Sequence, residues 1–411
     1  MKPVATELAA ESSSPAQTQS PPPVGLGRVP ERLAAARAAI AATGSTALVV
    51  AATGAGESGS ILRYLLGWMP ANSDAFLVLP VDGEPVLVSA DRNRARAFGM
   101  RLNGAVRVHK TLDAIAALRR ELGAIRSGAR ITAMGIGDLT VTRSAQFTAA
   151  LDGFDVVFDE SAVVDLRARR VAIDADAHVT ATRIADAIVQ HVLTLAGTRG
   201  MSGPELMAQA EYVGRRLGAD SAGCWLAIGD RPAETYFDMF ELLDDVPRTA
   251  RVQIGATVMA DGVFGQVLRI GVFGEPDAQL LTMAEELVRL QDAALAAIRP
   301  GEPITVIGDV LEAGIDRLTP LSRADDPFRF QSHHAMGASY SEPWAAPFTD
   351  AARDRSRDAG APVLVPGQVY EIHPNFTHPV LGHVCAGDVA LVTDDGARWL
   401  SRTPRGILRL S

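Results

Sequence analysis

Apolar and polar positions follow two different periods along the first part of the chain. Five short apolar runs have the length and composition of strands, and stretches with apolar residues at helical spacing separate most of them. Because strands that alternate with helices are typical of an α/β layer, we predict such a layer here. The expected strands are 47–51, 75–79, 85–89, 131–134 and 156–158, and the expected helices are 91–99, 112–122 and 144–151.

The pattern changes after about residue 170. A long helical run covers 174–196, and its apolar face includes Ile184, Ile188 and Val192. A second helix begins at Ser202-Gly-Pro-Glu205, since serine is a common N-cap and proline suits the first turn. This half is therefore expected to be α+β. Its further strands are 223–228, 251–259, 263–272, Val369–Ile372 and 389–392, and its further helices are 276–298 and 304–318.

The first 29 residues differ from the rest in composition. They are rich in proline, serine and alanine and lack an apolar core of the kind a signal peptide contains. We expect a disordered tail. The predicted organisation is thus a tail at 1–29, an N-terminal domain at 30–170 and a C-terminal domain at 171–411.

Bulk properties restrict the partners. The chain has 411 residues, 47% of them apolar, and a formal net charge of -9. This charge argues against a nucleic-acid partner, because binding phosphates needs a basic surface. No run approaches the ~20 apolar residues that a membrane helix requires. Cys224 and Cys385 are the only cysteines, which fits a reducing cytoplasm. A small-molecule substrate is the expected partner.

The candidate catalytic and metal-binding residues are concentrated near the C-terminus. Five of the eight histidines lie between positions 333 and 383. Histidine is the side chain most easily used as a metal ligand or as an acid–base catalyst at neutral pH. The two phrases that carry this signal are His333-His-Ala-Met-Gly-Ala-Ser-Tyr-Ser-Glu342-Pro and Gly367-Gln-Val-Tyr-Glu-Ile-His373-Pro.

These phrases resemble motifs of the pita-bread superfamily, which includes creatinases, prolidases and the proline-specific and methionine aminopeptidases of the peptidase M24 type. The resemblance covers nearly the whole chain after the tail, including an Arg63-Tyr-Leu-Leu-Gly67 turn like that of creatinase and prolidase relatives. It implies a creatinase-like α/β domain followed by a curved antiparallel sheet with two helix pairs. The matching positions are His334, Gly337 and Glu342 in the first phrase and Gly367, Val369, Ile372 and Pro374 in the second.

The family's metal ligands are mostly replaced. By resemblance, His334 corresponds to the metal-binding histidine, while His373 stands in place of a glutamate. Gln253 and Gln266 stand where two aspartates are usual, and Gly387 stands where a second glutamate is usual. Since divalent cations need several anionic oxygens, we expect neither a dinuclear metal centre nor another cofactor.

Creatinase keeps this fold without a metal, so the resemblance implies a metal-independent hydrolase that acts on a C–N bond of a small amino-acid or peptide-like substrate. The position of the family's catalytic histidine holds Tyr236 here, so His373 or His334 is expected to move the proton. The remaining candidates are Glu342 to orient a histidine or bind a cation, Gln253 and Gln266 to donate neutral hydrogen bonds, Arg269 and Arg231 to clamp a carboxylate, and Arg63 to reach the neighbouring subunit of a homodimer.

Alternatives remain open at this stage. His334, His373 and His383 could form a mononuclear three-histidine metal site. An Xaa-Pro-type metallopeptidase is a related hypothesis. A non-catalytic binding protein is a third hypothesis. The structural alternatives are core amides for Gln253 and Gln266, an ion pair between strands for Arg269, and solvated loop positions for His378 and His383. The substrate, and the choice among hydrolysis, elimination and isomerisation, do not follow from the sequence.

Overall fold

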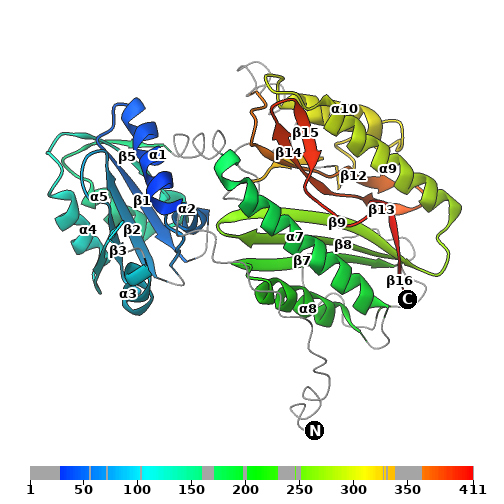
Figure 1. Ribbon diagram of the computed structural model, residues 1–411, viewed down its shortest axis with the longest axis horizontal. Coiled ribbons are helices and arrows are strands. Elements are labelled where there is room, and N and C mark those ends of the chain that lie inside the picture. Colours follow the sequence, from blue (N-terminus) through cyan, green and yellow to red (C-terminus); the bar gives the residue numbers. More distant parts are fainter. Residues whose placement is uncertain are drawn as a thin grey trace, which may run out of the picture.

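A computed structural model of the chain describes residues 28–54, 57–70, 73–101, 104–159, 171–197, 201–229, 246, 251–326, 328–329, 332–337 and 363–410. The class is α+β, as predicted, with an N-terminal layered unit and a larger C-terminal unit (Figure 1). The predicted boundary near residue 170 adjoins 160–170, which lies outside the described residues, as does most of the tail, so the division into domains stays a prediction.

The N-terminal unit is built on one six-stranded sheet with the order β4-β3-β2-β1-β5-β6. Strand β2 runs antiparallel to both neighbours, whereas β1, β5 and β6 are parallel to one another, as are β3 and β4. All five predicted strands are present, and β4 is additional. The strands are β1 (Ala47–Thr53), β2 (Asp74–Pro80), β3 (Val86–Ser89), β4 (Arg107–Lys110), β5 (Arg130–Met134) and β6 (Asp155–Phe158).

Helices cover both faces of this sheet. Leu48 and Val50 pack with α1 and α2 on one face, while Val49 packs with α4 and α5 on the other. A strand buried on both faces is a continuous apolar run, which is why β1 was visible in the sequence. The helices are α1 (Val29–Ala42), α2 (Glu57–Leu66), α3 (Arg92–Arg101), α4 (Ala114–Leu122) and α5 (Val141–Ala150).

The first half of the C-terminal unit consists of two helices on a second sheet (Figure 1). Helix α8 starts with the predicted capping box of Ser202 and Glu205. Alternate residues of β8, from Val252 to Val258, pack against α7, so its other residues face away from that helix. The sheet order is β16-β9-β8-β7. The elements are α7 (Val171–Ala196), α8 (Gly203–Arg216), β7 (Ser221–Gly229), β8 (Arg251–Ala260), β9 (Val263–Phe273) and β16 (Ile407–Leu410).

The second half repeats this arrangement with α9, α10 and a sheet of the order β10-β11-β14-β15. Leu268 and Gly387 exchange backbone hydrogen bonds of 3.0 and 3.2 Å, and this bridge connects the two sheets. The predicted pairs of helices are thus present. The elements are α9 (Ala278–Ala297), α10 (Thr305–Ile315), β10 (His333–Ala335), β11 (Val369–Ile372), β12 (Asn375–His378), β13 (Gly382–Cys385), β14 (Asp388–Thr393) and β15 (Gly396–Trp399).

An ion pair connects the two units. The Arg63 guanidinium on α2 contacts both carboxylate oxygens of Asp220, at 2.7 and 2.8 Å, just before β7. Arg63 also donates to the carbonyl of Gly67. Among the helices that the structure describes, none combines the length and apolarity needed to cross a bilayer.

Candidate functional site

Strand pairing brings the two histidine phrases together. In the antiparallel pair β10–β11, His334 lies directly opposite Glu371, so their side chains share one face of the sheet. His373 follows two residues later on that face, and its backbone N–H donates to Ser332 across the same pair of strands (2.9 Å). The rings of His334 and His373 meet edge to face, with centroids 5.2 Å apart. All three side chains are buried.

His373 is buried in a way that favours its neutral form. Neither ring nitrogen has a hydrogen-bond partner among the described residues. Burial lowers the pKa of His373 well below its ordinary value, and the adjacent His334 and His333 lower it further. A neutral imidazole without a protein partner has a nitrogen lone pair available to accept a proton.

Glu371 is a site residue that the sequence reasoning missed. Its side chain has no exposed surface, and neither carboxylate oxygen has a hydrogen-bond partner among the described residues. Burial, followed by the negative charge of Asp388, raises the pKa of Glu371 well above its ordinary value. The signal was present in the sequence, because residues 371 and 373 of one strand necessarily face the same side.

Gln253 belongs to a buried polar chain that spans three strands. Its Nε2 lies 3.1 Å from Nδ1 of His383, whose Nε2 contacts Oδ1 of Asn375. If Gln253 donates, His383 carries its proton on Nε2 and donates to Asn375. The His383 ring is also stacked on Phe328, and burial lowers its pKa to about 3. The expectation that His383 is a solvated loop residue is therefore wrong, whereas His378 is half-buried and accepts two backbone N–H groups.

Gln266 lies opposite Thr257 in the β8–β9 pair and is buried. The hydroxyl of Thr257 donates to its Oε1 over 3.4 Å, a long hydrogen bond. Gln253 and Gln266 lie on the face of the sheet that points away from α7. A Cβ at Gly255, between them on that face, would lie 2.1 Å from the indole nitrogen of Trp225. An indole ring thus occupies the space beside the two amides.

Arg269 has a different setting from the one expected of a carboxylate clamp. Its side chain is buried, and two of its nitrogens contact the carboxylate of Asp388 at 2.6 and 3.2 Å. The same guanidinium donates to the carbonyls of Gly387, Thr403 and Pro404. Each of its three nitrogens is therefore engaged within the protein. This is the alternative of an ion pair between strands, and we assign Arg269 no contact with substrate.

Other predicted residues lie away from this group. Glu342, Tyr236 and Arg231 are outside the described residues. Arg63 is bound to Asp220, at the contact between the two units. The site that the structure brings together is therefore His334, Glu371 and His373, whereas Gln253 and Gln266 lie on the neighbouring sheet.

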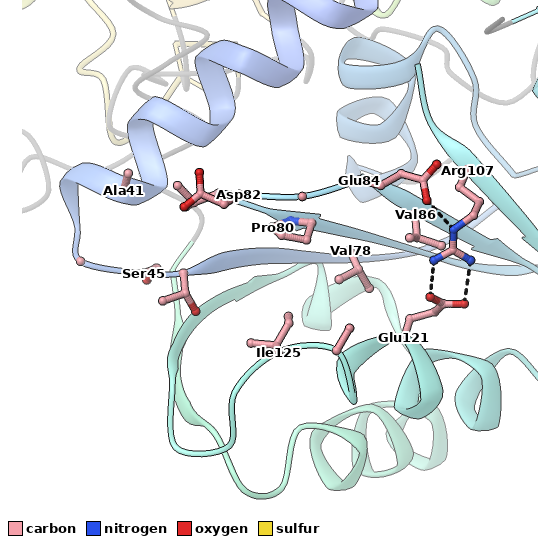
Figure 2. A pocket seen from close by; sticks show the side chains of 15 residues that line it. Ala41, Ser45, Val78, Pro80, Asp82, Glu84, Val86, Arg107, Glu121 and Ile125 are labelled. Carbon is pink, nitrogen blue, oxygen red and sulfur yellow. Dashed lines mark hydrogen bonds and ion pairs between the residues drawn. The ribbon is translucent and has the colours of Figure 1, made fainter. Parts of the chain in front are cut away.

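The N-terminal unit contains a surface pocket of about 600 Å³ (Figure 2). On its wall Arg107 donates to Glu84 and Glu121, the latter with two parallel hydrogen bonds. These hydrogen bonds lower the pKa of Glu121. The charged groups thus satisfy one another, in contrast to the buried histidine and glutamate of the C-terminal unit.

Comparison with known proteins agrees with this architecture. The model of metallopeptidase family M24 matches residues 176–395, and the chain belongs to this family. Among curated relatives, the probable dipeptidase PepE of Mycobacterium bovis is 28% identical over 157 residues, which is 38% of each chain. The putative dipeptidase YkvY of Bacillus subtilis is 25% identical over 280 residues, covering 66% of this chain and 71% of that one. The chain thus spans well under half of PepE.

Solved structures confirm the fold. The X-Pro aminopeptidase of Thermotoga maritima superposes with a TM-score of 0.73 at 16% identity, covering 91% of this chain and 100% of that one. At this identity the likeness concerns the fold alone. The predicted pita-bread architecture and the predicted membership of the superfamily are confirmed.

The family name implies a metal, and binding one needs several donor side chains close together. Among the described residues, no group of three or more histidine, cysteine, aspartate or glutamate side chains is arranged to hold an ion. The three-histidine alternative is not formed by these residues, because both ring nitrogens of His383 are engaged, one with Gln253 and the other with Asn375. The described residues therefore do not fit a metal centre.

Proposed function

We propose that the chain is a hydrolase of a C–N bond in a small amino-acid or peptide-like substrate, and that it works without a metal. Membership of family M24 and the names of its relatives, which are dipeptidases and an aminopeptidase, support the bond class. The amide side chains at Gln253 and Gln266 support independence from metal, because they are neutral and bind divalent cations poorly.

The observation that carries the proposal is the state of His373. The His373 imidazole has no hydrogen-bond partner among the described residues, so a nitrogen lone pair is open to water, which is the geometry a general base needs, although its lowered pKa makes it a weaker base than an exposed histidine. The ring of His334 packs edge to face with this ring, with centroids 5.2 Å apart. Gln253 and Gln266 would orient the substrate by neutral hydrogen bonds.

The sequence adds further candidates. Glu342 and Tyr236 are proposed to contact the reacting group, and Arg231 is proposed to bind a substrate carboxylate. By resemblance we also propose a homodimer in which Arg63 lies near the partner's site, although it is bound to Asp220 within its own chain. The low cysteine content supports the proposal of a cytoplasmic location. Light scattering of the purified chain tests the dimer directly.

The first experiment combines metal content with turnover. Dialysed protein should contain less than one metal per chain by plasma mass spectrometry, and chelators should leave its turnover of dipeptides, N-acyl amino acids or guanidino acids unchanged. His373→Ala should lower kcat by about 10²–10⁴-fold, the usual contribution of a general base.

The matched control is His191→Ala, since His191 lies on α7 and its Nε2 contacts Gln209 at 3.2 Å. We expect this variant to retain activity. Two metals per chain with chelator-sensitive activity would contradict the proposal, and so would unchanged turnover after His373→Ala.

A further inference from the structure

Glu371 occupies a space that exists because its neighbour is a glycine. A Cβ on Gly387 would lie 2.4 Å from Oε1 of Glu371, closer than any real contact of this kind. The same Cβ would lie 2.6 Å from Cδ1 of Leu268. Gly387 therefore leaves room for one carboxyl group at the point where the two sheets are bridged.

No cation in the described structure neutralises this carboxyl group by direct contact. Arg269 supplies a compensating positive charge, but its guanidinium is bound to Asp388 and to backbone carbonyls. The charges of Asp388 and Asp186 act in the opposite direction and disfavour ionisation of Glu371. A carboxyl group in this position favours its protonated form, because an ionised one would be buried without a partner among the described residues.

Cleavage of a C–N bond needs a proton donor as well as a base. The leaving nitrogen of an amide is a poor leaving group until it is protonated, and a positioned acid supplies that proton. Glu371 lies on the same face of β11 as His373, two residues before it, and directly opposite His334. Paired groups whose surroundings favour opposite protonation states mark the acid and the base of a site.

We propose that Glu371 is the general acid of this site and protonates the leaving nitrogen of the substrate; this inference rests on the proposed function. Water forms a bond to the carbonyl carbon as a ring nitrogen of His373 accepts one of its protons. The C–N bond then breaks as the carboxyl O–H of Glu371 gives its proton to the nitrogen. The products are a carboxylic acid and an amine, and the proton on His373 returns to Glu371.

The test is the dependence of rate on the leaving group, measured with alanyl anilides that range from 4-methoxyanilide to 4-nitroanilide. The 4-nitroanilide leaves without much help from an acid, whereas the 4-methoxyanilide needs protonation. Glu371→Gln should therefore slow the methoxy substrate by about 10²–10³-fold and the nitro substrate by less than about tenfold. A merely structural role would slow both substrates equally.

The control variant is Glu312→Gln, which also neutralises a buried glutamate but at an ion pair with Arg329, 2.8 Å long, on α10. It should keep the wild-type ratio of the two rates. Glu371→Asp retains a shorter acid, so it should hydrolyse the methoxy substrate faster than Glu371→Gln does. The ratio of the rates on the two substrates does not depend on the folded fraction, so it still reports the acid if the glutamine variant folds poorly.

Equal slowing of both substrates by Glu371→Gln overturns the inference and leaves the proposed function standing. An aspartate variant no faster than the glutamine variant also overturns it. Absence of hydrolysis of all the anilides, dipeptides, N-acyl amino acids and guanidino acids by the wild-type chain overturns the proposed function and the inference together.

Discussion

Two buried acidic side chains of the C-terminal unit, Glu371 and Asp388, lie at neighbouring positions of paired strands and differ in almost every respect. Asp388 is opposite Ile372 in the β11–β14 pair, so its side chain is on the other face of the sheet from Glu371. Asp388 binds Arg269 and Gln291, and the acceptor groups around Arg269 use each of its nitrogens. Glu371 and His373, in contrast, have no hydrogen-bond partner among the described residues.

The contrast distinguishes structural from functional burial. A buried ion pair is tolerated when hydrogen bonds satisfy both charges. Removing one partner destabilises the fold, because the other charge stays buried without compensation. A polar group left unsatisfied in the interior destabilises the fold, so unsatisfied groups that cluster on one face indicate a site. By this criterion the region of Arg269 holds the sheets together, and the region of Glu371 and His373 is the candidate site for which we propose a catalytic role.

The largest expected effect comes from breaking the satisfied pair. Arg269→Met leaves Asp388 buried with only Gln291 as a side-chain donor among the described residues. We expect the free energy of unfolding to fall by about 3–5 kcal/mol, as when one partner of a buried ion pair is removed. Urea titration measures the loss. Arg289→Met, at an exposed pair on α9, is the control and should produce no measurable change. A loss of stability for Arg269→Met no greater than for this control would show that the Arg269–Asp388 pair does not hold the sheets together.

Replacing Glu371, in contrast, should raise the free energy of unfolding at neutral pH. The raised pKa of Glu371 means that the folded chain binds its proton more tightly than the unfolded chain. The associated stability is complete below the ordinary glutamate pKa of about 4.3 and is lost as the pH rises toward the raised value. Glu371→Gln removes this dependence, so the variant should become progressively more stable than the wild type between about pH 5 and pH 8.

Parallel unfolding curves at several pH values measure this difference, which should stay below the loss at Arg269. Glu312→Gln is again the matched control. Because it breaks an ion pair with Arg329, it should be less stable than the wild type at neutral pH. A difference between Glu371→Gln and the wild type that shrinks with rising pH would show that Glu371 is ionised in the folded chain.

Much of the architecture was predictable because apolar runs mark strands that are buried on both faces. All five strands predicted in the N-terminal unit formed, whereas β4, whose sequence is Arg107-Val-His-Lys110, has no apolar run and was missed. The three-residue strand β10 was missed for a related reason, since two of its three residues are histidines and it contains no apolar run. Position within the fold, more than composition, makes these segments strands.

The site was predictable in part. The sequence indicated the neighbourhood of His334 and His373, but the roles of single residues depended on contacts between distant segments. Arg269 meets Asp388 across 119 positions, and Gln253 meets His383 across 130. Neither partner is visible from local pattern. Glu371, however, could have been found by applying the two-residue period of a strand to the second histidine phrase.

Gln253 shares features of both regions, because one end of its amide is satisfied and the other is not. Its Nε2 contacts His383, while its Oε1 has no hydrogen-bond partner among the described residues. Gln253→Met keeps the volume but removes the amide, and the loss of one buried hydrogen bond should cost about 1 kcal/mol of stability. If the amide also orients substrate, KM should rise by about tenfold while kcat changes little, because uniform binding is what is lost. Gln190→Met, which removes the 3.1 Å hydrogen bond from Gln190 on α7 to Thr403, is the control and should leave KM unchanged. A stability loss with an unchanged KM would assign Gln253 to the structural kind, with Arg269.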